Sequence, residues 1–193
     1  MPQKPILEKF DEGLVSSTSI VNEHVRLGKD SKIWHFCNVY GAEDGEVNIG
    51  EDTQVGSFTE IKPNVRVGSH CRFQSHVFVP DYVSIGNYVF VGPGVVFTND
   101  PNPSAIKSMK REELEKLEKT NIGDYAIIGA GSKIFCGITL GKFCLVGLGS
   151  VVIRDVPDYG VVAGNPAKVI GDIRDEKYKE RFKELQEIYD KVK

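Results

Sequence analysis

The 193-residue chain has little that would suit a membrane, a nucleic acid or a secretion route. No apolar run approaches the roughly 18 residues of a membrane-spanning helix. The stretch from Met1 to Glu8 lacks the apolar segment and the small-residue cleavage site of a signal peptide. A formal net charge of −3 leaves no general basic field for nucleic acid. We therefore expect a cytoplasmic protein without a membrane span and without a nucleic-acid partner.

Cysteine and histidine are also scarce, with four residues of each. The cysteines include no Cys-x-x-Cys pair of the kind that binds zinc, and four in a chain of this length do not make a disulfide framework. Cys37, Cys71 and Cys144 share one position of a six-residue repeat, and there we expect small buried side chains. Cys136 stands at a different position, where its thiol could be exposed.

That repeat is the dominant feature of the sequence. Aliphatic or aromatic residues recur at every sixth position from Val21 to Val39, from Ile49 to Phe97, and from Ile122 to Val152. A small or β-branched residue follows most of them by four positions, and a glycine directly follows many of them. A six-residue period suits a short strand with a tight turn, at which glycine would supply the unusual dihedral angles. Because one such unit cannot bury a core alone, we expect the units to stack into a parallel β-helix.

This pattern resembles that of the hexapeptide-repeat acyltransferases. The resemblance runs from about Val21 to Gly171 and includes the terminal stretch Val161-Val-Ala-Gly-Asn-Pro-Ala-Lys-Val-Ile170. It implies an all-β domain over residues 1–171, folded as a left-handed parallel β-helix with three hexapeptides in each triangular coil. The family also implies acetyl-CoA as co-substrate, no metal, and a homotrimer with active sites between neighbouring chains.

Residues 172–193 lie outside the repeat. Their apolar side chains are spaced by four and three positions, as Tyr178, Phe182, Leu185, Tyr189 and Val192. This spacing indicates an amphipathic helix. Such a helix could cap the last coil or could join an interface between subunits.

One long interruption of the repeat covers residues 98–121. A regular solenoid has no cleft of its own, so we interpret the interruption as an extruded loop that covers a substrate. It opens with Thr98-Asn-Asp-Pro-Asn-Pro103. The hexapeptide O-acetyltransferases carry a catalytic histidine at the place that Asn99 occupies here. An amide cannot accept a proton at neutral pH, so the usual O-acetyl mechanism would lack its base.

Three segments are similar to those of N-acetyltransferases that modify nucleotide-linked amino sugars, namely Phe97-Thr-Asn-Asp100, Ile33-Trp-His-Phe36 and Phe73-Gln74. Members of this group acetylate the 3-amine of a UDP-linked 2-acetamido-3-amino-glucuronate or of dTDP-linked 3-amino-6-deoxyhexoses. The resemblance therefore implies N-acetylation of a UDP- or dTDP-linked amino sugar for surface glycan synthesis. The chain departs from the group at Gln74-Ser-His-Val77, where Gln-Asn-Asn-Val is usual, and at Ser104, where an arginine often stands.

These matches suggest roles for individual residues. We expect Asn99 to orient the acceptor amine and His76 to act as a base, although His76 could instead be an exposed turn residue or a ligand contact. The substrate-binding candidates are Gln74, His35, Asp100 and Lys107. Two glycine-rich turns, 128–132 and 146–150, leave backbone groups open to a pantetheine arm. The acetyl-CoA-binding candidates are Ala130, Leu148, Val162 and Lys168.

Three other functions stay open from the sequence. The first is O-acetylation of a sugar or a small alcohol. The second is a γ-class carbonic anhydrase-like metalloprotein, which would bind zinc through histidines. His70 and His76 are six positions apart, which puts them on successive corners of a three-sided prism instead of above one another. The third is a noncatalytic module whose role is to form trimers.

Overall fold

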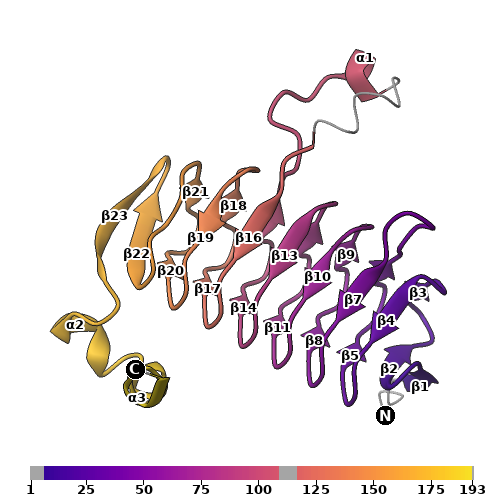
Figure 1. Cartoon of the computed structure of the whole chain (residues 1–193), viewed down its shortest axis with the longest axis horizontal. Helices are drawn as coiled ribbons and strands as arrows, with labels where there is room; N and C mark the ends of the chain where they lie inside the picture. The colour runs from indigo at the N-terminus through magenta and orange to yellow at the C-terminus, as the bar shows by residue number, and fades with distance from the viewer. Residues whose placement is uncertain (1–6, 109–116, 193) are drawn as a thin grey trace, which may run out of the picture.

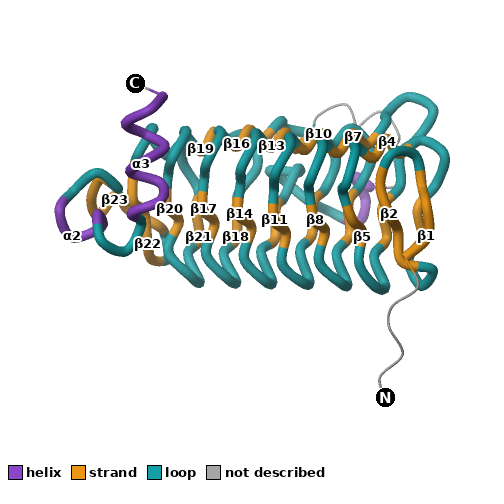
Figure 2. The backbone as a smooth tube through the Cα atoms, turned by 90° about the horizontal axis from the view of Figure 1, so that it is seen from below, coloured by secondary structure: helices purple, strands orange, loops and turns teal. Residues whose placement is uncertain are grey.

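The computed structural model describes residues 7–108 and 117–192, which form one elongated solenoid (Figure 1). Successive coils lie side by side along its length, and the two chain ends lie at opposite ends of it (Figure 2). Each coil contributes one strand to each of three sheets, here named A, B and C in the order in which a coil visits them. The predicted left-handed parallel β-helix is confirmed.

The strands are short, and most contain two or three residues. Sheet A contains β1 (Leu7–Phe10), β2 (Gly13–Ser16), β5 (Lys32–Ile33), β8 (Gln54–Val55), β11 (Arg72–Phe73), β14 (Phe90–Val91), β17 (Ile127–Ile128), β20 (Leu145–Val146), β22 (Gly160–Gly164) and β23 (Ala167–Asp172). Sheet B contains β3 (Ile20–Val21), β6 (Asn38–Val39), β9 (Glu60–Ile61), β12 (Phe78–Val79), β15 (Val96–Phe97), β18 (Lys133–Ile134) and β21 (Val151–Val152). Sheet C contains β4 (Val25–Leu27), β7 (Val47–Ile49), β10 (Arg66–Val67), β13 (Val83–Ile85), β16 (Thr120–Ile122) and β19 (Thr139–Leu140).

The hydrophobic core lies inside the solenoid and is made by the residues that recur at every sixth position. Ile33, Val55 and Phe73, for example, are inward residues of sheet A and are at most 2% exposed. Cys37, Cys71 and Cys144 are buried beside them, as their repeat position predicts. Cys136 is only 1% exposed, so the prediction that its thiol could be exposed is wrong.

Glycine has a different purpose from the one that the sequence suggested. The left-handed turn positions, with φ between 46° and 67°, are mostly taken by aromatic and polar residues such as Phe58, His76 and Tyr125. The glycine that follows an inward residue is required by the neighbouring coil. A Cβ on Gly68 would lie 2.6 Å from the carbonyl oxygen of Gly86, and a Cβ on Gly141 would lie 2.4 Å from the nitrogen of Asp158. Close approach of successive coils therefore explains these glycines, and turn geometry does not.

The C-terminal segment folds as two helices instead of the single predicted one, α2 (Glu176–Lys179) and α3 (Lys183–Val192). Tyr178, Phe182 and Leu185 pack against a cluster built on Phe143, Val161 and Ile173. This contact lies on the side of the last coils, whereas β23 pairs with β22 at the end of sheet A. The helices thus cover a flank of the solenoid. None of the described helices is long and apolar enough to cross a membrane.

Stacked rings line the corner at which sheet C passes into sheet A, which we call the C/A corner. His70, Tyr88, Tyr125, Phe143 and Tyr159 follow one another with centroid distances of 4.6, 4.9, 4.6 and 5.4 Å. The Arg174 guanidinium lies 4.2 Å from the last ring centroid. Aromatic stacking and cation–π contact at this spacing stabilise the coils against one another.

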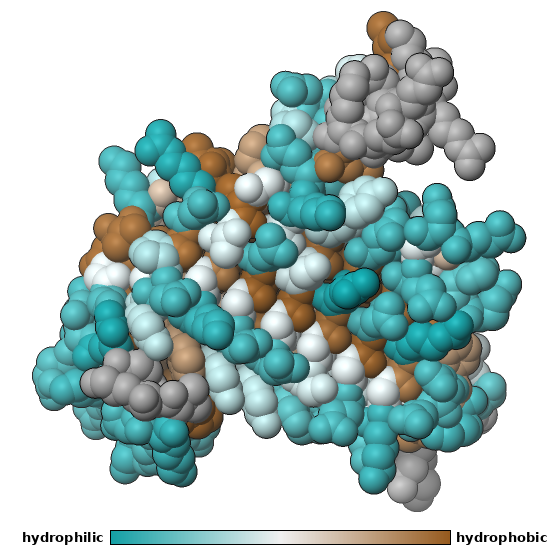
Figure 3. All heavy atoms as spheres, viewed as in Figure 1, coloured by the Kyte–Doolittle hydropathy of each residue, from teal (hydrophilic) through white to brown (hydrophobic). Residues whose placement is uncertain are grey.

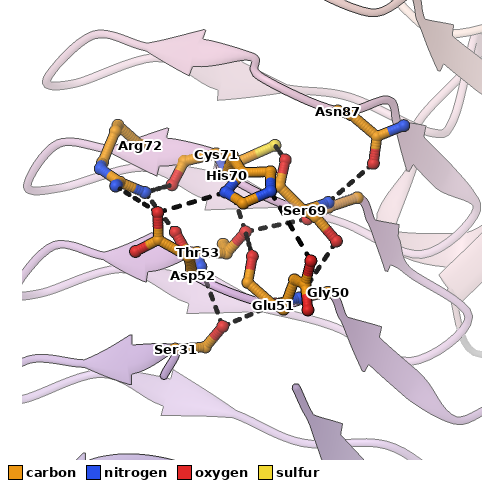
Figure 4. A network of polar contacts seen from close by, with 11 residues as sticks. Ser31, Gly50, Glu51, Asp52, Thr53, Ser69, His70, Cys71, Arg72 and Asn87 are labelled. Atoms are coloured by element: carbon orange, nitrogen blue, oxygen red, sulfur yellow. Dashed lines mark hydrogen bonds and ion pairs between the residues drawn. The ribbon is translucent and has the colours of Figure 1, made fainter. Parts of the chain in front are cut away.

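A polar network continues the same corner toward the N-terminus (Figure 4). One carboxylate oxygen of Asp52 accepts a hydrogen bond from Arg72 at 2.9 Å and lies 3.2 Å from Nδ1 of His70. Arg72 also donates to the main-chain carbonyl of Asp52. The Arg72 hydrogen bond, followed by that of His70, lowers the pKa of Asp52.

We expect Asp52→Asn to destabilise the protein at neutral pH by no more than about 1 kcal/mol, because the pair is exposed. Since the folded-state pKa is depressed, the contribution of Asp52 is present above its unfolded pKa and is lost as pH falls through the folded value. Thermal unfolding of both proteins from pH 7 to pH 3 should therefore show a difference that shrinks toward the acid end of this range, where Asp52 begins to be protonated. A difference that grows in acid would contradict this account.

Candidate functional site

The corner at which sheet A passes into sheet B, which we call the A/B corner, changes character halfway along the solenoid. In its first half the rings of Phe36, Phe58 and His76 stack with centroid distances of 5.2 and 4.8 Å. In its second half the same left-handed position is held by Gly94, Gly131 and Gly149. A Cβ on Gly131 or Gly149 would meet nothing within 4 Å. The ring stack thus ends at His76, and a side-chain-free strip begins beyond it.

Two predicted acetyl-CoA contacts border this glycine strip. Ala130 is exposed, and Leu148 is 82% exposed. The carbonyl of Ala130 accepts a hydrogen bond from the Gly149 N–H at 2.7 Å, so it is already used within the fold. An extended ligand along the strip could still reach the exposed backbone next to these residues.

The other two predicted acetyl-CoA contacts lie near the end of the solenoid. The Val162 side chain is buried, its carbonyl accepts from Gly147 N–H at 2.8 Å, and the residue borders the hollow that Lys168 lines. Lys168 is exposed on β23. It lines a hollow of about 260 Å³ together with Arg154, Asp155 and Val152. Arg154 is a second cation that the sequence reasoning missed, although it stands only two residues after β21.

The predicted substrate-binding residues Gln74 and His35 share the A/B corner with His76. Gln74 and His76 are exposed, two positions apart after β11. His35 lies two coils earlier, and its Nδ1 is 2.7 Å from the Ser16 hydroxyl and 3.1 Å from the Thr18 hydroxyl. One ring nitrogen of His35 is therefore held by the N-terminal coil.

The extruded loop leaves the solenoid at the corner between sheets B and C, which we call the B/C corner, and it projects from the upper edge of the solenoid in the view of Figures 1 and 3. Its stem is closed by a hydrogen bond from the Glu118 N–H to the Asn99 carbonyl at 2.8 Å. The Asp100 carboxylate accepts from the Asn102 N–H at 2.9 Å. Within the loop lies the helix α1 (Ala105–Ser108), which includes Lys107. The side chain of Lys107 and residues 109–116 are outside the part that the structure describes.

The loop stem also explains why Cys136 is buried. Thr98 donates from its hydroxyl to the Ile134 carbonyl at 3.3 Å, and its hydroxyl also lowers the pKa of the Cys136 thiol. Burial is the main cause that raises the pKa of Cys136, and the charges of Glu118 and Asp100 add to it. The thiol is therefore kept neutral beneath the stem.

Asn99 and His76, the two predicted catalytic residues, lie on opposite edges of sheet B. Phe78 pairs with Val96 between β12 and β15, so Asn99 is level with Asp81, which is five residues beyond His76. At about 3.3 Å per residue, the two corners are roughly 16 Å apart along the strand. One chain therefore does not bring Asn99 and His76 together.

Residues 46–81 match the family profile described as bacterial transferase hexapeptide (six repeats). The chain thus contains hexapeptide repeats of the bacterial transferase type over these residues. The predicted relationship to the hexapeptide-repeat acyltransferases is thereby confirmed.

Curated relatives of this hexapeptide-repeat protein include several acetyltransferases. It is 46% identical over 57 residues to dTDP-3-amino-3,6-dideoxy-alpha-D-galactopyranose 3-N-acetyltransferase of Aneurinibacillus thermoaerophilus. The matched residues make up 30% of each chain. It is 51% identical over 51 residues to serine acetyltransferase 4 of Arabidopsis thaliana, or 26% of this chain and 14% of that one. The chain thus spans less than a third of the length of these relatives.

Solved structures extend the likeness over most of the fold. A UDP-N-acetylglucosamine acyltransferase superposes with a TM-score of 0.71 at 22% identity, covering 92% of this chain and 68% of that one. A hexapeptide-repeat acetyltransferase of Vibrio cholerae superposes with a TM-score of 0.56 at 25% identity, covering 66% and 74%. The first match concerns the fold alone. Among the described residues, no three histidine, cysteine, aspartate or glutamate side chains are grouped so as to hold a metal ion.

Proposed function

We propose that this protein is an acetyl-CoA-dependent N-acetyltransferase that acts on the amine of a UDP- or dTDP-linked amino sugar in surface glycan synthesis, in the cytoplasm. The observation that carries the proposal is the glycine strip at the A/B corner, which begins where the ring stack ends at His76. A strip without side chains lets the narrow, amide-bearing arm of acetyl-CoA lie against the backbone. Ala130 and Leu148 border it, and the exposed cations Lys168 and Arg154 near its far end suit the phosphates.

The choice of an amine acceptor rests on the loop stem. Asn99 stands at the start of the loop, and its amide can donate to or accept from an acceptor group but cannot remove a proton. A neutral amine is nucleophilic without prior deprotonation, whereas a hydroxyl needs a base. The relative from Aneurinibacillus thermoaerophilus is named for N-acetylation of a dTDP-linked 3-amino sugar, which is the acceptor class that we propose here.

A homotrimer would bring the separated halves of the site together. Six of the eleven exposed large apolar side chains of the described residues lie on the A/B corner, on a strand of sheet B or directly after one, namely Ile20, Phe36, Phe58, Phe135, Leu148 and Ile153. A face of this kind favours association with a second copy. If the A/B corner of one chain packs near the B/C corner of the next, His76 and Gln74 meet Asn99 and Asp100 of its neighbour.

The proposed reaction is attack of the amine on the thioester carbonyl. Asn99 orients the amine, and such positioning can lower a barrier by several kcal/mol. A backbone N–H of the glycine-rich turns 128–132 or 146–150 stabilises the oxyanion of the tetrahedral intermediate. The N–H groups of Gly94, Gly131 and Gly149 themselves already donate to carbonyls of the preceding coil. His76, whose ring stacks on Phe58 and which holds the same corner position one coil before Gly94, receives the amine proton as the C–N bond forms.

O-acetylation is the second candidate, because the chain also matches serine acetyltransferases, including a solved one with a TM-score of 0.52 at 27% identity. In that case His76 would deprotonate the hydroxyl. The deciding experiment is a panel of UDP- and dTDP-linked 3- and 4-amino sugars with acetyl-CoA, in which thiol release is followed. The matched controls are the same nucleotide sugars with a hydroxyl in place of the amine, and serine.

Turnover of an amino sugar but not of its hydroxyl counterpart is the expected result. Turnover of the hydroxyl compounds alone would replace N-acetylation by O-acetylation. A protein that binds no acetyl-CoA by calorimetry would be a noncatalytic module instead.

A further inference from the structure

Asp81 lies in the column of residues that contains Asn99. It follows β12 at the B/C corner, 18 positions before Asn99. The register of Phe78 with Val96, continued three residues past the printed pair, puts the two at about the same level, and the chain returns from the loop opposite Tyr82. Backbones of neighbouring coils are about 4.8 Å apart, so an acceptor group held by Asn99 is within reach of the Asp81 side chain. The six-residue rhythm alone gives no reason for a carboxylate here.

The Asp81 carboxylate is half-buried, and within residues 7–108 and 117–192 no cation is paired with it. Lys62 acts on it from the preceding coil, but the Lys62 ammonium donates to the Tyr40 hydroxyl at 2.5 Å and lies 3.7 Å from Glu60. Among the described residues, no lysine, arginine or histidine forms an ion pair with Asp81. Binding of an external cation is favourable at a half-buried carboxylate that has no paired cation.

The other charged group that acts on Asp81 is acidic, namely Asp44 in the turn between β6 and β7. Burial is the largest influence on Asp81 and raises its pKa. A hydrogen bond from its own backbone and the Lys62 charge lower the pKa, and the Asp44 charge raises it. A raised pKa makes a carboxylate a better proton acceptor than an exposed aspartate.

We propose that Asp81 binds the acceptor as an ammonium ion and removes its first proton, so that a neutral amine is presented to Asn99. The inference rests on the proposed function and deepens it, because it selects cationic amines over hydroxyls. The proton passes from the ammonium to the carboxylate, which leaves a neutral amine and a neutral Asp81. The amine then attacks the thioester carbon, the C–N bond forms, the C–S bond breaks, and the CoA thiolate takes up the second amine proton directly or through His76. Asp81 returns its proton to solvent, so the cycle releases one proton overall.

The test compares Asp81→Asn with the wild-type protein and with a control variant, Asp44→Asn. The control also removes one carboxylate, that of Asp44, whose charge acts on Asp81. The readouts are kcat/KM for the amino sugar identified by the panel, measured from pH 6 to pH 9.5, and the calorimetric Kd for acetyl-CoA. The asparagine side chain has nearly the size of aspartate and adds no buried charge, so we expect the variant to fold with an unchanged melting temperature.

At pH 7 we expect Asp81→Asn to lower kcat/KM by about 100-fold or more. The deficit should shrink as pH rises toward the pKa of the acceptor amine, because the amine then loses its proton without help. The kcat/KM of Asp44→Asn and the Kd of Asp81→Asn for acetyl-CoA should change little.

A loss of kcat/KM below about threefold at pH 7, or a loss of equal size at every pH, would overturn the role of Asp81 as proton acceptor. If the wild-type protein acetylates no amine, the proposed function fails and this inference fails with it, whereas an active wild type with an unimpaired Asp81→Asn variant overturns this inference alone.

Discussion

Asn99→Ala is expected to lower kcat/KM for the amino sugar by about 100-fold, because loss of the group that orients the acceptor costs at least this much in comparable positioning roles. The Kd for acetyl-CoA should stay the same, since Asn99 lies at the B/C corner and the glycine strip at the A/B corner. The measurement is steady-state thiol release with calorimetry of acetyl-CoA. Asn121→Ala is the matched control, because Asn121 is exposed on β16, just beyond the loop.

His76→Ala separates two versions of the mechanism. If His76 accepts the amine proton, its removal should slow the reaction by about tenfold to a thousandfold. If the amine and the departing thiolate manage the proton between them, activity should hardly change. We expect Asn99→Ala to be at least as harmful as His76→Ala. Full activity of Asn99→Ala together with an inactive His76→Ala would show a histidine-dependent enzyme and would contradict the orientation mechanism.

Gly141→Ala is expected to destabilise the fold by about 3 kcal/mol, because the added methyl group would meet backbone atoms that cannot move independently. Its Cβ would lie 2.4 Å from the nitrogen of Asp158 and 2.6 Å from the carbonyl carbon of Pro157. In a chain of this length, that loss corresponds to a melting temperature about 6–12 °C lower.

Gly147→Ala is the matched comparison, at the same position of the next hexapeptide. Its nearest contact would be the Ala163 side chain at 3.0 Å, so we expect a much smaller change in melting temperature. Equal melting temperatures for the two variants would show that coil-to-coil contact is not the reason for glycine at this position.

The fold could be predicted from the sequence because the six-residue repeat that defines it is contained within short segments of the chain. Each inward residue, such as Val55 or Ile128, is identified by its place in the six-residue period. The reason for glycine could not be predicted, because it depends on how closely two coils approach. The burial of Cys136 was missed for a similar reason, since its cover is Thr98 in the loop stem, more than thirty positions away in the sequence.

The candidate site was only half visible in the sequence. The motifs identified Asn99, Gln74 and His76, but their separation across sheet B follows from the register of β12 and β15. Asp81 gave no motif at all, although counting back one coil of 18 residues from Asn99 would have found it. Arg154 was overlooked because a cation after the last strand gains meaning only from the hollow that it shares with Lys168.

The central claim is that acetyl transfer takes place at a site shared by two copies of this chain, with His76 from one and Asn99 from the other. The most direct measurement mixes the His76→Ala and Asn99→Ala proteins in equal amounts, dissociates and reassociates them, and follows acetyl transfer to the amino sugar. At a shared site, about a quarter of the interfaces regain both side chains, so activity should return to about a quarter of the wild-type value. A mixture no more active than the average of its two components would contradict the shared site.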